Sequence, residues 1–244
     1  MSVKIVSLLL FGFFLTLNNF TEAKIIRTEH HLAPSDLLDD AQALLDDLSD
    51  LVEGNILVAH DQLNNLRYEV VAESINVRLQ AEIDIEQEHQ VLDLELTNLK
   101  ELAFAAEADI SSCLEGNEDK LAALPDSYTS SMSECITTLQ QGSDTTLNDT
   151  RYQVDVVYSS VRSLSFALDQ CRRDEECISG VIDQIKAATE DLPLQIQVYV
   201  DGAEDEMDIV KVKIQNCADT NLANFVLEGS QIMDEITDCV NDII

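Results

Sequence analysis

Six cysteines are the residues of this sequence that are best suited to chemistry. They lie at positions 113, 135, 171, 177, 217 and 239, all in the second half of the chain or close to its start. Cysteine pairs serve as metal ligands, redox centres or structural disulfides, and the spacing between them indicates which. The closest pair, Cys171 and Cys177, encloses the sequence RRDEE.

This spacing fits neither a zinc site nor a thioredoxin-type site. A zinc finger needs close pairs such as C-x-x-C together with a second pair of cysteines or histidines. Here five residues separate Cys171 from Cys177, and all four histidines of the chain precede Cys113. A thioredoxin-type pair needs two intervening residues. We therefore interpret the six cysteines as partners in three structural disulfides, with RRDEE as a loop between two helices: Cys113, Cys135, Cys171, Cys177, Cys217 and Cys239.

Helix length restricts how these cysteines pair. Twenty-two residues of continuous helix separate two positions by about 33 Å, whereas the Cα atoms of bridged cysteines lie roughly 5.5–6 Å apart. Cys113 with Cys135, and Cys217 with Cys239, therefore pair only if the chain doubles back between them, which Gly and Pro residues allow more readily in the first case. In an up-and-down bundle of several helices, Cys135 and Cys239 would meet at one end, so this pair is preferred. The pairing of the other four stays open.

No other pattern in the sequence indicates catalysis, a cofactor or a bound metal. Carboxylates are so abundant that any two could be named an acid/base pair, and a solvated helix face explains them equally well. The motifs G-x-S-x-G and H-E-x-x-H and a Gly-rich phosphate loop do not occur. Residues 201–208, DGAEDEMD, have the composition of a calcium loop but lack its alternating ligand order. We expect a non-enzymatic protein without a cofactor.

The first 23 residues have the features of a secretory signal peptide. Lys4 precedes an apolar run at 5–17, and small residues follow at 21–23. This run of about 13 residues is shorter than the roughly 20 that a bilayer-spanning helix needs. We expect a secreted, extracellular protein that begins near Lys24. Asn148 begins an Asn-Asp-Thr acceptor for glycosylation, and whether it carries a glycan stays open.

The charge of the chain restricts its partners. The formal net charge is −33 at pH 7, and the few basic residues are scattered. Nucleic acid and anionic membranes repel such a surface. We therefore expect no nucleic-acid binding and no stable membrane insertion, and a protein partner or self-association remains possible.

Composition and periodicity predict an all-α protein. Apolar residues make up 45% of the chain, with seven glycines, three prolines and no tryptophan. Residues 24–34 are interpreted as a mobile leader, and Ser35 or Asp36 as the cap of a helix that Gly54-Asn55 ends. Residues 56–113 contain neither Gly nor Pro and predict one long helix or two that meet at a kink, with apolar steps of three and four that slip around 73–88.

Further helix breakers divide the rest of the chain into shorter helices. They lie at Gly116-Asn117, Pro125, 142–144, the RRDEE loop, Pro193 and near Asp219. Residues 194–214 also alternate as a β-hairpin would, but an unbroken 4,3 spacing favours a helix. We predict long, coiled-coil-like, acidic amphipathic helices at 35–110, followed by a disulfide-stabilised helical bundle at 111–240.

The cysteine half resembles a known family. The segments that carry the resemblance are SSCLEG (111–116), SECITTL (133–139), LDQCRRDEEC (168–177), IQNCADT (214–220) and ITDCV (236–240). Residues 105–240 resemble the secreted domain of flies that is named after the tsetse EP protein. The resemblance implies an insect secreted protein of the midgut lumen without established enzymatic activity. The chain lacks the Glu-Pro repeat tail of the name-giving member.

Two functions of different classes follow from these observations. The first is a secreted interaction or structural protein, a disulfide-stabilised helical domain with an acidic coiled-coil-like arm. The second is an extracellular carrier of lipid or another small ligand, built from amphipathic helices. The carrier is the less favoured of the two because the polar helix faces lack the basic residues that hold such helices on anionic membranes.

Overall fold

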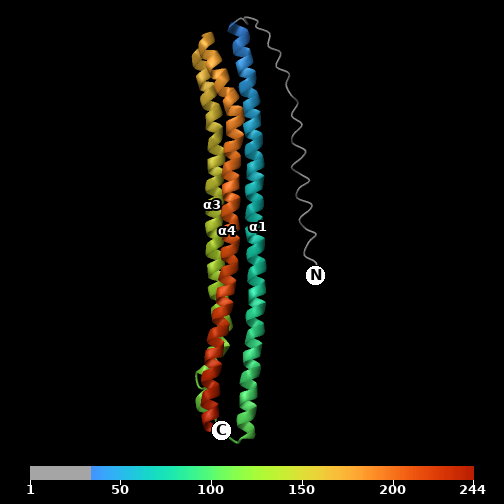
Figure 1. Cartoon of the computed structure of the whole chain (residues 1–244), viewed down its shortest axis with the longest axis vertical. Helices are drawn as coiled ribbons and strands as arrows, with labels where there is room; N and C mark the ends of the chain where they lie inside the picture. The colour runs from blue at the N-terminus through green and yellow to red at the C-terminus, as the bar shows by residue number, and fades with distance from the viewer. Residues whose placement is uncertain (1–33) are drawn as a thin grey trace, which may run out of the picture.

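The computed structural model describes residues 34–244, which form a long rod of three helices (Figure 1). The helices are α1 (Pro34–Ala105, 72 residues), α3 (Asn117–Cys171, 55 residues) and α4 (Glu175–Ile243, 69 residues), with the short α2 (Ser111–Leu114) between α1 and α3. At 1.5 Å per residue, α1 is about 108 Å long. No strand occurs within residues 34–244, so the all-α prediction is confirmed, and residues 194–214 are helical.

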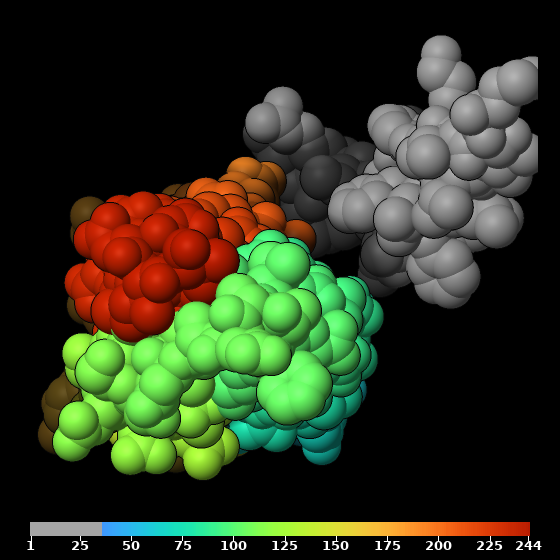
Figure 2. All heavy atoms as spheres, turned by 90° about the horizontal axis from the view of Figure 1, so that it is seen from below, coloured from blue at the N-terminus to red at the C-terminus, as the bar shows by residue number. Residues whose placement is uncertain are grey.

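The chain reverses direction twice along the rod, once between α1 and α3 and once between α3 and α4. α1 runs from one end of the rod to the other, α3 returns, and α4 runs parallel to α1 (Figure 1). Viewed from the end at which α1 finishes, α1, α3 and α4 occupy the corners of a triangle, and the green chain that joins α1 to α3 lies across that end (Figure 2). Each helix therefore packs against both others.

The beginning of α1 differs from the prediction. The signal peptide predicted at 1–23 and the leader predicted at 24–34, apart from Pro34, lie outside the described residues. α1 begins at Pro34, so Ser35 and Asp36 lie inside the helix and neither is its cap. Proline suits a first helical position because its φ is already helical and its missing N–H would have no partner there.

The helix end predicted at Gly54-Asn55 is wrong, because α1 continues through it. Val52 and Ala59 on either side are fully buried, and the Asn55 side chain donates to the carbonyl of Leu51 at 2.7 Å. A glycine inside a helix costs only about 1 kcal/mol relative to alanine. The free energy gained by burying the apolar face of α1 before and after Gly54 exceeds that cost. Of the range 56–113, predicted as one long helix or two that meet at a kink, residues 56–105 form one continuous helix. Residues 106–110 leave the helix although they contain neither Gly nor Pro, and Ser111–Leu114 form the separate α2.

Most of the other predicted breakers also lie inside helices. Pro125 and residues 142–144 belong to α3, and Pro193 and Asp219 belong to α4. Thr129 donates its hydroxyl to the carbonyl of Pro125 at 2.5 Å, inside the helix. An interior proline costs about 3 kcal/mol, which long helices with a continuous buried face tolerate.

Two predicted breaks do occur, and local hydrogen bonds explain them. Gly116 adopts a φ of 77°, which favours glycine, and α3 begins directly after it. Asp174 ends the turn at 172–174, and its carboxylate accepts from the N–H of Cys177 at 3.1 Å as the cap of α4. Asp109 likewise accepts from the N–H of Ser111, at 3.0 Å, and from its hydroxyl, and these bonds lower the pKa of Asp109.

The core consists of three apolar clusters along the rod. In each cluster, residues of α1 pack against residues of α3 and α4. The predicted acidic helices at 35–110 and the predicted cysteine domain at 111–240 therefore contribute to the same three clusters. The disulfide-stabilised helical bundle is confirmed, and α1 is one of its helices.

Candidate interaction surface

All six cysteines form disulfides, as the even count predicts, and the pairs are nested. Cys113 bonds to Cys239, Cys135 to Cys217, and Cys171 to Cys177, with Cα–Cα distances of 5.6, 6.2 and 5.3 Å. The last pair closes the turn between α3 and α4 and is called the tip disulfide below. A structural role was predicted for CRRDEEC, with Cys171 and Cys177 in two separate disulfides; the two cysteines instead bond to each other.

The preferred pair Cys135–Cys239 is wrong. That preference rests on several short helices that reverse at Pro125, 142–144 and Pro193, and none of these segments reverses the chain. α3 and α4 are instead the two arms of one hairpin. In such a hairpin, Cys135 faces Cys217 and Cys239 faces Cys113 near the far end.

The disulfides leave α1 outside the covalent framework. They join α2 to α4, α3 to α4, and the two sides of the tip, whereas α1 contains no cysteine. α1 is attached by the chain that follows Ala105 and by side-chain packing. Both interfaces of α1, the one with α3 and the one with α4, therefore rest on non-covalent contacts alone.

Polar side chains define the register between α1 and α3. Arg67 donates from Nε to Asp144 Oδ1 and from Nη2 to Asn148 Oδ1, both at 2.8 Å. Arg151 of α3 donates to Asn64 Oδ1 at 2.6 Å. These contacts form a seam between α1 and α3, called the α1/α3 seam below. His60 lies at one end of it, with its Nε2 2.9 Å from Asp155 Oδ1. These contacts fix the two antiparallel helices in one register.

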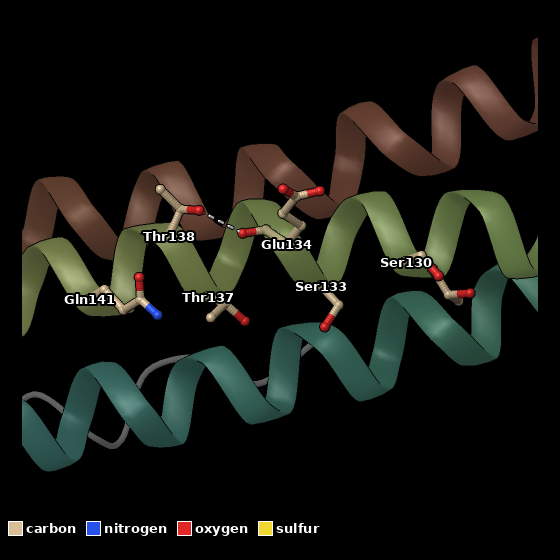
Figure 3. Close-up of a pocket in the computed structure, with 7 residues that line it drawn as sticks. Ser130, Ser133, Glu134, Thr137, Thr138 and Gln141 are labelled. Atoms are coloured by element: carbon tan, nitrogen blue, oxygen red, sulfur yellow. Dashed lines mark hydrogen bonds between the residues drawn. The ribbon is translucent and has the colours of Figure 1, made fainter.

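A polar groove of about 660 Å³ lies on the surface of α3 beside α1 (Figure 3). Figure 3 shows Ser133 and Thr137 on the side of α3 toward α1. We call this surface the hydroxyl groove; its lining residues are Thr129, Ser130, Ser133, Glu134, Thr137, Thr138 and Gln141. It offers many hydrogen-bond donors and acceptors and a single carboxylate, on a rigid helix.

Exposed apolar residues form a strip on α1 at the same level, which begins on the side that borders α3 and turns toward the outer side along the helix. The five side chains are 39–71% exposed and follow steps of three, four, four and four; they are Tyr68, Val71, Ile75, Leu79 and Ile83. Val71 and Ile75 lie one and two turns after Arg67, so they project from the side of α1 that borders α3. Because Arg67 faces Asp144 and Asn148, Ile75 and Leu79 lie level with the hydroxyl groove.

Neither surface was predicted from the sequence, although the sequence contains a signal for the apolar strip. The apolar spacing slips around 73–88, where two apolar faces overlap. Val77, Ala81 and Ile85 belong to the core, while Ile75 and Leu79 belong to the exposed strip. A second apolar face on one helix blurs its periodicity. The hydroxyl groove has no comparable signal, since serine and threonine are ordinary on a solvated helix.

Two further contacts tie the long helices together and shift pKa values. Lys211 of α4 pairs with Asp208 at 2.8 Å and with Glu69 of α1 at 3.3 Å, and its hydrogen bond to Asp208 is the main reason that its pKa is raised. Tyr128 of α3 donates to Glu228 of α4 at 2.5 Å, which raises the pKa of the phenol. Both contacts stabilise the register of α4 rather than create a reactive group.

The predicted glycosylation acceptor lies inside α3 rather than in a loop. Asn148 is exposed but its carbonyl oxygen accepts from Arg67, and Thr150 of the same motif is buried. A glycan on Asn148 would therefore have to be added before the helix packs. Glycosylation of Asn148 stays a prediction.

Within residues 34–244, no group of three or more His, Cys, Asp or Glu side chains is arranged to hold a metal ion. In the same part of the chain, no helix is both long and apolar enough to cross a bilayer.

Comparisons with known proteins give no relative. No protein-family model matches the chain, and neither the curated proteins nor the solved structures contain a match. The resemblance to the tsetse EP-type domain therefore stays a prediction.

Proposed function

We propose that this chain is a secreted, non-enzymatic interaction or structural protein that docks a protein partner across the α1/α3 seam, with the insect gut lumen as its expected location. The observation that carries the proposal is the apolar strip on α1 beside the hydroxyl groove on α3. Contiguous exposed apolar side chains with a polar rim are typical of interaction sites.

The charge of the chain favours a heterologous partner over a second copy. Two chains that each carry a formal charge of −33 repel one another, whereas a partner with basic residues around an apolar contact is attracted. Three disulfides in an extracellular protein also fit a rigid scaffold that persists outside the cell. The partner expected here has an apolar centre and a basic rim.

A photo-crosslinking experiment tests the proposal. A photoreactive residue would be placed at Thr137 in the hydroxyl groove and, as a matched control, at Ile209, which is 53% exposed on α4. The secreted protein would be irradiated in its native extracellular fluid. We expect one dominant protein adduct from position 137, and its loss in an Ile75→Asp/Leu79→Asp variant. Equal adducts from both positions, or adducts that the double variant leaves unchanged, would contradict this docking surface.

One observation favours a lipid or small-ligand carrier as a second candidate. Because α1 contains no cysteine, it could swing away from the linked α2–α3–α4 unit and expose the apolar faces of the core. A carrier of this kind should retain apolar molecules in intact native mass spectra and bind neutral lipid emulsions. A bare chain mass together with no emulsion binding would remove this candidate.

A further inference from the structure

The turn between α3 and α4 concentrates accessible positive charge. Arg172 and Arg173 lie between the end of α3 at Cys171 and the start of α4 at Glu175, and both are exposed. Every other lysine and arginine between residues 34 and 244 lies inside a long helix: Arg67, Arg78, Lys100, Lys120, Arg151, Arg162, Lys186, Lys211 and Lys213. This turn therefore differs from every other basic site in the described chain.

The backbone of the turn is not helical. Arg172 has a φ of 55° and a ψ of −98°, and within residues 34–244 neither arginine forms an ion pair. The N–H of Asp174 donates to the carbonyl of Cys171 at 2.9 Å, which closes the turn. The turn that joins α3 to α4 lies at one end of the rod (Figure 1), and both of its arginines are exposed.

These properties match what a trypsin-type serine protease requires. Such a protease selects Arg or Lys because an aspartate in its S1 pocket pairs with the cationic side chain. It also needs an extended substrate backbone, which a three-residue turn reaches by opening one turn hydrogen bond, whereas a site inside a packed helix becomes available only after local unfolding of the helix. Exposed loop tips are the preferred places for a first cut.

We propose that Arg172-Arg173 is a processing site for a trypsin-type protease, which converts the chain into a disulfide-linked two-chain protein. One peptide bond is hydrolysed after Arg172 or Arg173. The hydroxyl of water joins the arginine carbonyl carbon to form a new carboxylate, and its proton passes to the released amine. The change adds one water and needs no oxidant or cofactor.

The tip disulfide limits the consequences of this cut. Cys171 and Cys177 flank both bonds, and their Cα atoms are held 5.3 Å apart. The last turn of α3 and the first turn of α4 thus remain joined after cleavage. Cys135–Cys217 and Cys113–Cys239 connect the two chains further along the hairpin. The two-chain product keeps its fold, and the basic sites inside the helices stay protected.

Limited trypsin digestion of the oxidised, secreted protein tests the proposal. We expect one rapid internal cut, a non-reduced product that gains the mass of one water apart from any trimming before Pro34, and two fragments after reduction, the second beginning at Arg173 or Asp174. In an Arg172→Gln/Arg173→Gln variant, the first internal cut should slow at least about tenfold, because cleavage then depends on helix unfolding. Circular dichroism would confirm that this variant is folded.

A second variant tests the role of the tip disulfide. In Cys171→Ser/Cys177→Ser protein, the new ends should fray, and cleavage should continue at the neighbouring helical sites Arg162 and Lys186. In the wild-type protein it should stop after the first cut. A first internal cut at a helical site, or a digestion rate that the double Gln variant leaves unchanged, would overturn the proposal. Continued digestion of the wild-type product at the rate of the Ser variant would do the same.

Discussion

The glycines inside the long helices allow a quantitative test of the fold. Four of them are exposed and lie within a helix: Gly54, Gly142, Gly180 and Gly202. A Cβ added at any of these positions meets no other atom within 4 Å. Alanine is better than glycine in a helix interior by about 0.8–1.0 kcal/mol, because glycine loses more backbone freedom on folding.

The quadruple Gly→Ala variant should therefore gain about 3–4 kcal/mol in the free energy of unfolding. The four sites lie in different turns and share no partner, so their effects should add. For a domain of this size, 1 kcal/mol shifts the midpoint of thermal unfolding by about 2–4 °C. We expect an increase of about 6–16 °C, measured by circular dichroism and calorimetry on the oxidised protein.

The same substitution at two other glycines supplies matched controls. Gly116 has a φ of 77°, so alanine there should lower the stability by roughly 1–2 kcal/mol. At Gly229, a new Cβ would lie 2.5 Å from Cδ1 of Leu92, and Leu92 must move, so the gain should be smaller than at the four exposed sites. A fall in the midpoint for any of the four exposed sites would refute helices that are continuous at those sites, and a rise for Gly116→Ala would refute the break at Gly116.

Three other outcomes follow from the disulfides, the tyrosine contact and the net charge. With Cys135–Cys217 intact, Cys113–Cys239 closes a loop of about 45 residues. A Cys113→Ser/Cys239→Ser variant should therefore lose about 4 kcal/mol of unfolding free energy in urea, against about 2 kcal/mol for loss of the tip disulfide, whose cysteines are six residues apart. Equal losses would contradict the nested pairing. Because the pKa of Tyr128 is raised in the folded protein, its bond to Glu228 stabilises the fold fully below about pH 10 and is lost as the pH rises through that raised pKa. Absorbance titration should show one phenol moving to lower pH in a Glu228→Gln variant, and superimposable curves would disprove the contact. Raising NaCl from about 10 mM to about 1 M shortens the Debye length from about 30 to about 3 Å. Because this screens the repulsion within a chain of net charge −33, the unfolding temperature should rise. A fall in the unfolding temperature would mean that the ion pairs outweigh this repulsion.

Apolar periodicity predicted the helices and most of the core. Of the seven steps at 196, 200, 203, 207, 210, 214 and 217, six are buried in α4 and Val210 is half-buried, which explains why the helical interpretation of 194–214 is confirmed. Cys135 and Cys177 also continue the apolar spacing of their helices, which would predict buried positions, but both lie at exposed edges beside buried Ile136 and Ile178. A disulfide at a helix interface needs its sulfur at the edge, where a neighbouring helix comes near without filling the centre of the core.

Local breaker signals failed wherever long-range packing opposed them. Gly54, Pro125 and Pro193 each disfavour a helix locally by a few kcal/mol at most. Each also has buried apolar residues on both sides, and an end at any of them would expose part of that face. The helix break predicted at Gly116 is confirmed because the turn into α3 requires the positive φ of this glycine.

The cysteine spacing itself contained the pairing that the breakers obscured. Going outward from the tip disulfide, Cys135 lies 36 residues before Cys171 and Cys217 lies 40 residues after Cys177, and each outer cysteine follows after a further 22 residues. Two helices of one antiparallel hairpin rise equally per residue, so bridged positions must lie at nearly equal distances from the tip. A Cys135–Cys239 bond would require arms that differ by 26 residues, or about 39 Å of helix, which no disulfide spans. The observed pairs both differ by the same four residues, close to one helical turn. The near-symmetry of the six spacings is thus the mark of a single long hairpin, and it requires α3 and α4 to pass uninterrupted through the prolines at 125 and 193.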